Sequence, residues 1–303
     1  LQAKFPESPM NSFTHQKPFT RPQIIAHRGA SAYAPENTRS AFLKAIELGA
    51  DWFELDVQLT RDGAMAVFHD RDVSRFAVKH IPIYDLTMSD LRSLDVGSWF
   101  SEEYAHERVI TLEEALELAS GKIGVYIELK STVDETPRIP DMLEVVFQSK
   151  SLSAWDWRYL FDAGHRISAD SMVLAQRAID LVRKYRDQCR MVVQAFSPVI
   201  AMVFRKEAPD IPFEFLGMDL PEPPNIWRDF VLFGEKIDVE GFNVCRTSLT
   251  EERFLYFQKK KKRCAVWVVD EPEEIRQFTA MGVHGLISNK PDICRTELSA
   301  LGY

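Results

Sequence analysis

The stretch IIAHRGASAYAPENTRSAFLKAIELGADWFELDV, residues 24–57, has the pattern of a strand, a turn, a helix and a second strand. The first apolar run stops at His27 and Arg28, and the second carries two acids, Glu54 and Asp56, two positions apart. A strand, a helix and a strand in this order form the unit of a parallel sheet, so the two strands are expected to lie side by side. Because charges are seldom buried without a partner, the charged groups near the strand ends indicate a function there.

The segment between the two strands predicts one helix. Four apolar side chains fall on one helical face: Ala41, Phe42, Ala45 and Ile46. Asn37 or Thr38 can cap its start, and Gly49 can end it. Glu36 and Asn37 are expected to be turn and capping residues, with support of the region around Arg28 as their functional alternative.

Strand and helix signals alternate over the rest of the chain. Thr111 and Glu114, for example, form a capping box at the start of a helical run. The eight predicted strands are 23–27, 52–59, 123–130, 190–196, 212–218, 239–245, 264–270 and 283–289. This alternation predicts an α/β fold of the (β/α)8 TIM-barrel type, and a doubly wound open sheet is the structural alternative.

Three parts of the chain exceed a minimal barrel. Residues 1–22 contain four prolines and no apolar periodicity, which predicts an N-terminal arm before a single barrel domain, 23–303. The segment 71–109 is an insertion, and 131–169 is a second extra segment that contains several aromatic residues. Loops of this length are usually either functional or disordered.

A hairpin is predicted directly after the second strand. In QLTRDGAMAVFHD, residues 58–70, Asp62 and Gly63 separate two apolar runs and predict the turn. The returning strand would bring His69 back to about the level of Glu54.

Composition limits the partners and the compartment. The formal net charge is −8, so no nucleic acid is expected as a partner, and no apolar run approaches the roughly 20 residues that span a bilayer. The four cysteines are far apart: Cys189, Cys245, Cys264 and Cys294. Free thiols favour a reducing compartment, so a cytoplasmic protein is expected, or a periplasmic or secreted one if the N-terminus is a processed end.

The carboxyl ends of the strands form the active face of a parallel barrel. Seven side chains are expected to meet there: His27, Arg28, Glu54, Asp56, His69, Glu128 and Lys130. Three clustered carboxylates would repel one another, and a hard divalent cation such as Mg²⁺ or Ca²⁺ removes that penalty. Arg28 and Lys130 suit a phosphate, and two histidines suit acid and base chemistry, so the set predicts phosphodiester cleavage.

Three motifs in this order resemble the glycerophosphodiester phosphodiesterase family: HRGASAYAPENT, ELDVQLTRDGAMAVFHD and YIELK. The segment DLTMSDLRSLDVGSWFSEEYAHERVITLEEAL, residues 85–116, is similar to the small insertion of that family, which overhangs the active site. The resemblance covers roughly 23–292.

This resemblance implies a TIM-type barrel and one divalent cation, Mg²⁺ or Ca²⁺. It implies that the cation is held by Glu54, Asp56 and Glu128. It assigns His27 as the base and His69 as the acid, and it implies that Arg28 and Lys130 bind the phosphate of the substrate. Phe196 and Trp267 match aromatic residues that wall the pocket in relatives, with ordinary core packing as the alternative.

The chain also departs from the family's usual motifs. The family usually has Trp-Thr-Val-Asn where this chain has Trp267, Val268, Val269 and Asp270. It usually has Thr-Asp, a basic residue and proline where this chain has Ser288, Asn289, Lys290 and Pro291. His284 stands where an aspartate is common. These departures leave every expected metal ligand and both histidines in place.

The expected activity is metal-dependent hydrolysis of a small-molecule glycerophosphodiester to sn-glycerol 3-phosphate and an alcohol. A lysophospholipase D-like activity on longer lipid diesters is an alternative, which a larger apolar rim would favour and which the aromatic cluster Trp155 to Phe161 leaves open. A catalytically silent phosphate- or headgroup-binding module is the second alternative. The sequence leaves open the identity of the alcohol, the oligomeric state, and whether hydrolysis is direct or passes through a cyclic phosphate.

Overall fold

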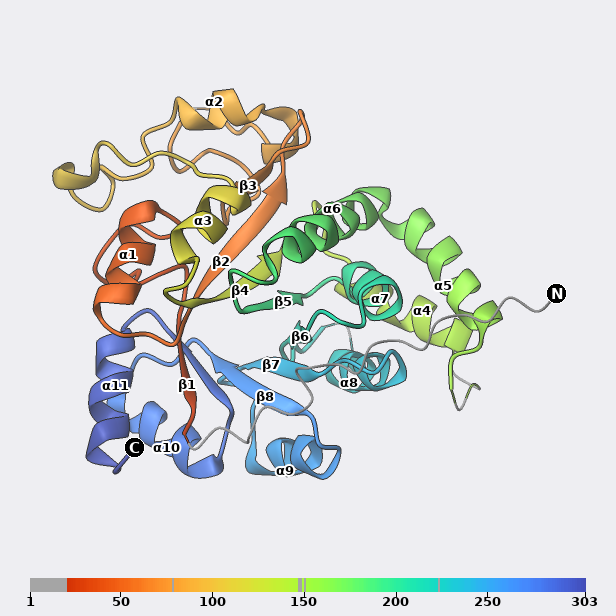
Figure 1. Cartoon of the computed structure of the whole chain (residues 1–303). Coiled ribbons are helices and arrows are strands. Elements are labelled where there is room, and N and C mark those ends of the chain that lie inside the picture. Colours follow the sequence, from red (N-terminus) through yellow and green to blue (C-terminus); the bar gives the residue numbers. More distant parts are fainter. Residues whose placement is uncertain (1–20, 78, 147–148, 150, 223) are drawn as a thin grey trace.

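The structure, a computed structural model, describes residues 21–77, 79–146, 149, 151–222 and 224–303. Within these residues, eight parallel strands close into a barrel that is surrounded by helices (Figure 1). The barrel strands are β1 (Gln23–Ala26), β2 (Trp52–Leu59), β4 (Gly124–Leu129), β5 (Met191–Ala195), β6 (Phe213–Gly217), β7 (Gly241–Cys245), β8 (Arg263–Trp267) and β9 (Gly285–Ser288). They pair in the order β1-β9-β8-β7-β6-β5-β4-β2, and pairing of β1 with β2 closes the ring. The predicted TIM-type barrel is confirmed, and the open sheet is wrong.

Helices connect consecutive barrel strands and follow the last one. They are α1 (Arg39–Glu47), α3 (Leu112–Ala119), α6 (Ala169–Tyr185), α7 (Pro198–Glu207), α8 (Ile226–Lys236), α9 (Glu251–Lys259), α10 (Pro272–Met281) and α11 (Pro291–Ala300). Their buried faces pack on the strands; the rings of Phe42 on α1 and Phe53 on β2, for example, stack with centroids 4.4 Å apart. Among the described residues, no helix has the length and apolarity needed to cross a membrane.

The ends of α1 confirm part of the sequence interpretation. Thr38 caps the helix, because its side chain accepts from the Ala41 N–H, and Gly49 follows the last turn with a φ of +73°. Asn37 is not the cap. Its φ is +58°, and its side chain contacts Asp56 on the next strand instead.

The predicted hairpin is present. Strand β3 (Met65–Val67) runs antiparallel to β2, with Val67 opposite Val57. The turn contains Gly63 at a φ of +77°, a conformation that glycine adopts at little cost. The Phe68 N–H donates to Asp56 O over 2.9 Å, so His69, the next residue, lies beside the C-terminal half of β2.

The segment 71–109 forms a small lobe beside β3 (Figure 1). It contains η2 (Ile83–Asp85), α2 (Met88–Arg92) and η3 (Glu102–Tyr104). Its apolar side chains form a separate cluster with those of the hairpin: Ala66, Phe68, Val73, Ile83, Met88, Leu91, Val96 and Val109.

The segment 131–169 is largely helical. It contains η4 (Thr136–Arg138), α4 (Ile139–Val146) and α5 (Ala154–Ile167), and α5 lies at the edge of the molecule beyond α7 (Figure 1). Of the predicted arm, 1–22, all but Arg21 and Pro22 lies outside the described residues.

Candidate active site

Three carboxylates, two of them buried and that of Glu128 partly buried, lie together near the carboxyl ends of β2 and β4. Parallel pairing sets Asp56 opposite Glu128, and alternation of side chains puts Glu54 on the same side of β2 as Asp56. One oxygen of each carboxylate lies within 4.8 Å of the others. The structure thus brings the three predicted metal ligands together.

Arg28 and Lys130 border this cluster. Lys130 Nζ lies 3.0 Å from Glu128 Oε1 and 3.3 Å from Asp56 Oδ1. Arg28 Nε lies 3.3 Å from Asp56 Oδ2, and the Arg28 backbone N–H donates to Glu54 Oε2 over 2.8 Å. When all five groups are ionised, the cluster therefore keeps one negative charge in excess.

Amide side chains hold two of the carboxylates in position. Asn37 Nδ2 donates to Asp56 Oδ2 over 2.8 Å, while Asn37 Oδ1 accepts from the Asp56 N–H over 3.2 Å. Gln194 Nε2 lies 3.4 Å from Glu54 Oε1, and Asn243 in turn donates to Gln194 Oε1 over 2.6 Å. The orientation of these two carboxylates is thus supported by amides on three different segments.

The three carboxyl groups respond differently to this environment. Burial, reinforced by the charges of Asp56 and Glu128, raises the pKa of Glu54 well above its ordinary value. Burial also raises the pKa of Glu128, although Lys130 opposes that shift. Burial alone would raise the pKa of Asp56 too, but the charges of Lys130 and Arg28 outweigh it and leave that pKa below its ordinary value.

A divalent cation fits this donor set. Carboxylate oxygens are the ligands that Mg²⁺ and Ca²⁺ prefer. The raised pKa of Glu54 reflects burial first and then repulsion by Asp56 and Glu128, and a bound cation would offset both. Two further positive charges would turn the excess negative charge into one excess positive charge. A singly charged phosphodiester would then balance the site.

His27, at the end of β1, is oriented by Asn289 at the end of β9. Its Nδ1 lies 2.7 Å from Asn289 Oδ1, and Asn289 Nδ2 donates to Asp270 Oδ2 over 2.6 Å. Enclosure of the ring, together with the charge of Arg28, lowers the pKa of His27 to about 4. The imidazole is therefore neutral at neutral pH and can accept a proton.

His69 reaches the site from the hairpin and is oriented by Asp70. Its Nδ1 lies 2.9 Å from Asp70 Oδ1. Gln58, on β2, donates from Nε2 to the backbone oxygens of Phe68, His69 and Asp70, at distances of 2.8, 3.2 and 2.7 Å. Gln58 thus fixes the turn that carries the histidine.

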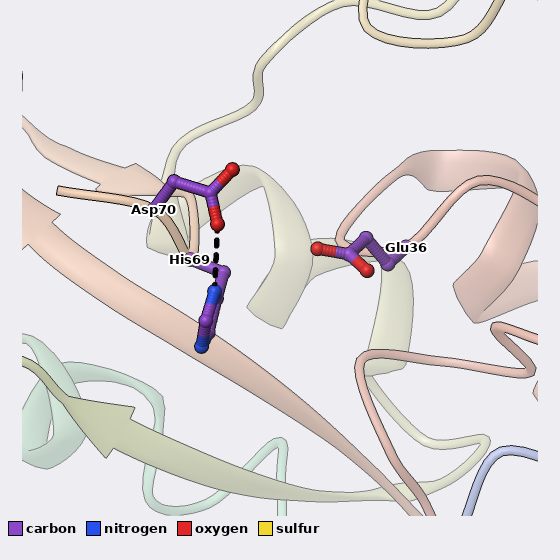
Figure 2. A group of neighbouring side chains, drawn as sticks. All are labelled: Glu36, His69 and Asp70. Atoms are coloured by element: carbon purple, nitrogen blue, oxygen red, sulfur yellow. Dashed lines mark hydrogen bonds and ion pairs between the residues drawn. The ribbon is translucent and has the colours of Figure 1, made fainter. Parts of the chain in front are cut away.

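Glu36, His69 and Asp70 form a second group of potential ligands (Figure 2). Figure 2 shows Glu36 pointing toward His69 and Asp70 from a separate segment. Arg75 joins the two acids, because NH2 lies 2.7 Å from Glu36 Oε1 and Nε lies 2.9 Å from Asp70 Oδ2. Glu36 Oε1 also lies 3.1 Å from Arg28 NH1. Since arginines already neutralise both acids, this group is an ion-pair network rather than a cation site.

An open cavity of about 510 Å³ adjoins His69, Glu128 and Lys130. Phe196 lines it, together with apolar residues of β6, α4 and α8: Leu216, Ile139, Ile226 and Phe230. Trp267 is not among the lining residues. Its ring packs edge-on against Phe196 with centroids 5.7 Å apart, and its Nε1 donates to Asn243 O over 3.1 Å.

The two extra segments differ in their relation to the cavity. Arg71, Asp72 and Ser74 of the first, and the beginning of the second at 131–139, contribute to its lining. The aromatic residues of α5 do not, and Trp155 and Tyr159 are 66% and 57% exposed. The second segment therefore meets the cavity through its first residues and not through the aromatic residues of α5.

Sequence reasoning missed several residues that hold the site. Gln58 follows Asp56 by two positions on the same strand, so the alternation that linked the two acids could have found it. Asn37 was expected mainly at the helix cap, with support of the region around Arg28 as the alternative, and its contact with Asp56 was not foreseen. Asp70 is adjacent to His69, but its contact with the ring depends on the turn of the hairpin.

Comparisons with known proteins identify relatives of this chain. Residues 27–293 match the sequence model of the Glycerophosphoryl diester phosphodiesterase family. A glycerophosphodiester phosphodiesterase of Caldanaerobacter subterraneus is 29% identical over 271 residues, which cover 89% of this chain and 94% of that protein.

Solved structures share the barrel fold. A phosphodiesterase from Oleispira antarctica, solved with the product sn-glycerol-3-phosphate, has a TM-score of 0.72 at 21% identity, over 92% of this chain and 97% of that one. The glycerophosphodiester phosphodiesterase of Thermotoga maritima has a TM-score of 0.65 at 23% identity, over 92% and 99% of the two chains. With a match to the family over nearly its whole length, this chain belongs to the glycerophosphoryl diester phosphodiesterase family.

Proposed function

We propose that this phosphodiesterase hydrolyses glycerophosphodiesters to sn-glycerol 3-phosphate and an alcohol, with one divalent cation and two histidines. The observation that carries the proposal is the cluster of three carboxylates, two buried and one partly buried, beside Arg28 and Lys130. Such a cluster costs stability unless it serves a cation, and the two basic groups suit the anion that the cation would share.

Glu54, Asp56 and Glu128 would hold the cation, Mg²⁺ or Ca²⁺. When bound, it would supply charge stabilisation at the phosphate oxygens. Arg28 and Lys130 would bind the same phosphate and limit its orientation, because both lie against the ligand carboxylates.

The partners of the two histidines differ and suit different roles. His27 faces the neutral amide oxygen of Asn289 and has a lowered pKa, so it suits the base that takes the proton of the nucleophile. His69 is held by the Asp70 carboxylate at Nδ1 and reaches the site from the hairpin, a different segment from that of His27, so it would serve as the acid that protonates the leaving alkoxide. The same pair can serve attack by water or by the neighbouring hydroxyl of the substrate, and the second route would release a cyclic phosphate first.

The alternatives have less support. The aromatic cluster that left an activity on lipid diesters open lies on α5, away from the cavity. A silent binding module would not need two histidines that each have Nδ1 already occupied. The described cysteines are free thiols, which supports a reducing compartment such as the cytoplasm.

The test is release of glycerol 3-phosphate from glycerophosphocholine after treatment with EDTA and after addition of Mg²⁺ or Ca²⁺. Activity should disappear with EDTA and return with the cation, and Glu128→Gln should raise the cation concentration needed. Full activity of the metal-stripped protein would contradict the cation role. Absence of product under every condition would contradict the function itself.

A further inference from the structure

The hydrogen bonds behind His27 fix the orientation of the Asn289 amide. Asp270 accepts from Asn289 Nδ2 over 2.6 Å and from the Asn289 backbone N–H over 2.7 Å. Ser288 Oγ also donates to Asp270, over 2.8 Å. An ionised carboxylate can only accept, so a rotated amide would set its oxygen against an oxygen of Asp270. The Asn289 amide must therefore point its oxygen at His27.

This orientation also fixes the tautomer of His27. The amide oxygen can only accept, so His27 Nδ1 must carry the proton in the 2.7 Å hydrogen bond. In the neutral ring, Nε2 then has the free lone pair. Among the described residues, His27 Nε2 has no hydrogen-bond partner that would compete for it. Ser31 Oγ lies 2.7 Å from the same Asn289 oxygen and completes its surroundings.

We propose that Asp270 and Asn289 are positioning residues that present His27 as the Nδ1-protonated tautomer, with Nε2 free to accept the proton of the nucleophile. This inference rests on the proposed role of His27 as base. Asp270 and Asn289 would act only by orienting His27, and neither would touch the reacting atoms.

The neutral partner has a consequence that a carboxylate would not have. Arg28, Asp56 and Glu36 are the charged groups with the largest effects on His27, and the Asn289 amide lies between the ring and the Asp270 carboxylate. A carboxylate in direct contact would stabilise the imidazolium and raise the pKa of His27, so the neutral ring that acts as base would form only at higher pH. The amide keeps the base neutral in mildly acidic solution.

The contact also joins two separate features of the sequence. The family's usual asparagine is replaced by Asp270, and its usual aspartate by Asn289. In the structure these two residues are hydrogen-bonded to each other. In this chain the Asp270 carboxylate therefore contacts His27 only through the Asn289 amide.

The experiment compares Asp270→Asn, Asn289→Asp and the double exchange, with Asp187→Asn as control because that carboxylate is 96% exposed. Values of kcat and KM are measured from pH 4 to 9 with glycerophosphocholine and the cation. Asp270→Asn frees the amide to rotate, so kcat should fall about 10²-fold, the lower end of the contribution of a positioned base, with little change in KM. Asn289→Asp alone should lower Tm, because it brings two carboxylates into contact.

The double exchange separates positioning from a merely structural role. It restores one amide and one carboxylate, so Tm and most of kcat should return. The acid limb of kcat/KM should move up by about 1 to 2 pH units, because the ring now faces a charge. An unchanged acid limb in the double variant, or an unchanged kcat in Asp270→Asn, would overturn the proposal.

A second readout does not depend on activity. The ¹⁵N NMR shifts of the His27 ring in the cation-free protein, identified by comparison with His27→Gln, report which nitrogen is protonated. We expect Nδ1–H in the natural protein and a mixture in Asp270→Asn. Protonation at Nε2 in the natural protein would overturn the positioning role even if the enzyme is active. Nδ1–H in a protein without diesterase activity would refute the function and leave the positioning intact.

Discussion

Glu54→Gln should have opposite effects on stability with and without the cation. The structure places its carboxylate within 4.8 Å of two others, and at that separation two unit charges repel by about 3.5 kcal/mol at an effective dielectric constant of 20. Arg28 and Lys130 offset part of this repulsion. We therefore expect the cation-free variant to gain about 1 to 2 kcal/mol at pH 8, a rise in Tm of about 2 to 4 °C.

The stability difference between Glu54→Gln and the natural protein should depend on pH in one direction. The pKa of Glu54 is raised in the folded protein, so folding opposes its ionisation. The cost is absent well below the ordinary value of 4.5 and grows as pH rises from there toward the raised value. The advantage of the variant over the natural protein should therefore grow between pH 5 and pH 8 in EDTA.

With the cation bound, the natural protein should be more stable than Glu54→Gln. A ligand at 100 times its Kd stabilises the folded state by about 2.7 kcal/mol, which is a rise of about 5 °C here. Glu54→Gln removes one of three ligands and should lose most of that rise. Melting curves in EDTA, Mg²⁺ and Ca²⁺ measure both effects, and Glu135→Gln is the matched control, because Glu135 is buried against serine hydroxyls outside the cluster. The reasoning would be refuted if Glu54→Gln had a lower Tm than the natural protein in EDTA at pH 8. It would also be refuted if neither Mg²⁺ nor Ca²⁺ raised the Tm of the natural protein.

The other predictions concern the histidines and their supports. His69→Ala should lower kcat/KM on glycerophosphocholine by about 10²–10⁴-fold but spare a nitrophenyl phosphodiester, whose leaving group needs no proton. His27→Ala should lower the rate on both substrates, and equal losses for both variants on both substrates would contradict the division of roles. Gln58→Ala should lower kcat about 10-fold with little change in KM, because the turn carrying His69 loses three hydrogen bonds; steady-state kinetics with an unchanged kcat would argue against this. Arg75→Ala should lower kcat less than Gln58→Ala does and should make activity more sensitive to salt, since Asp70 loses its ion pair; identical salt profiles would count against the network.

The fold was predictable because its signal is local. Each barrel strand is an apolar run, and the helix between the first two has a cap, an apolar face and a terminal glycine within a dozen positions. The same local signal was present in 131–169 and was overlooked. Ser153 and Asp156 form a capping box at the start of α5, so the second extra segment is helical rather than a long loop.

The chemical groups of the site were also predictable, because carboxylates, histidines and basic residues at strand ends are rare without a reason. Their supports were not. The amide of Asn37 contacts a carboxylate 19 positions away, and that of Asn289 contacts a histidine 262 positions away. Neutral amides are common on any surface, so composition and spacing do not distinguish a structural amide from a cap or a loop residue.

The hydrogen-bonded series His27, Asn289 and Asp270 shows the physical reason why such polar supports could not be predicted from the sequence. Hydrophobic periodicity repeats along the chain, whereas a polar contact depends only on which strand ends the closed barrel brings together. Closure sets β9 beside β1, so Asn289 meets His27, and the residues after β8 bring Asp270 behind both. In the sequence these are two unrelated departures from a motif, each of which leaves the expected catalytic groups intact. In the closed barrel they decide which nitrogen of His27 holds the proton, and therefore whether the base can act.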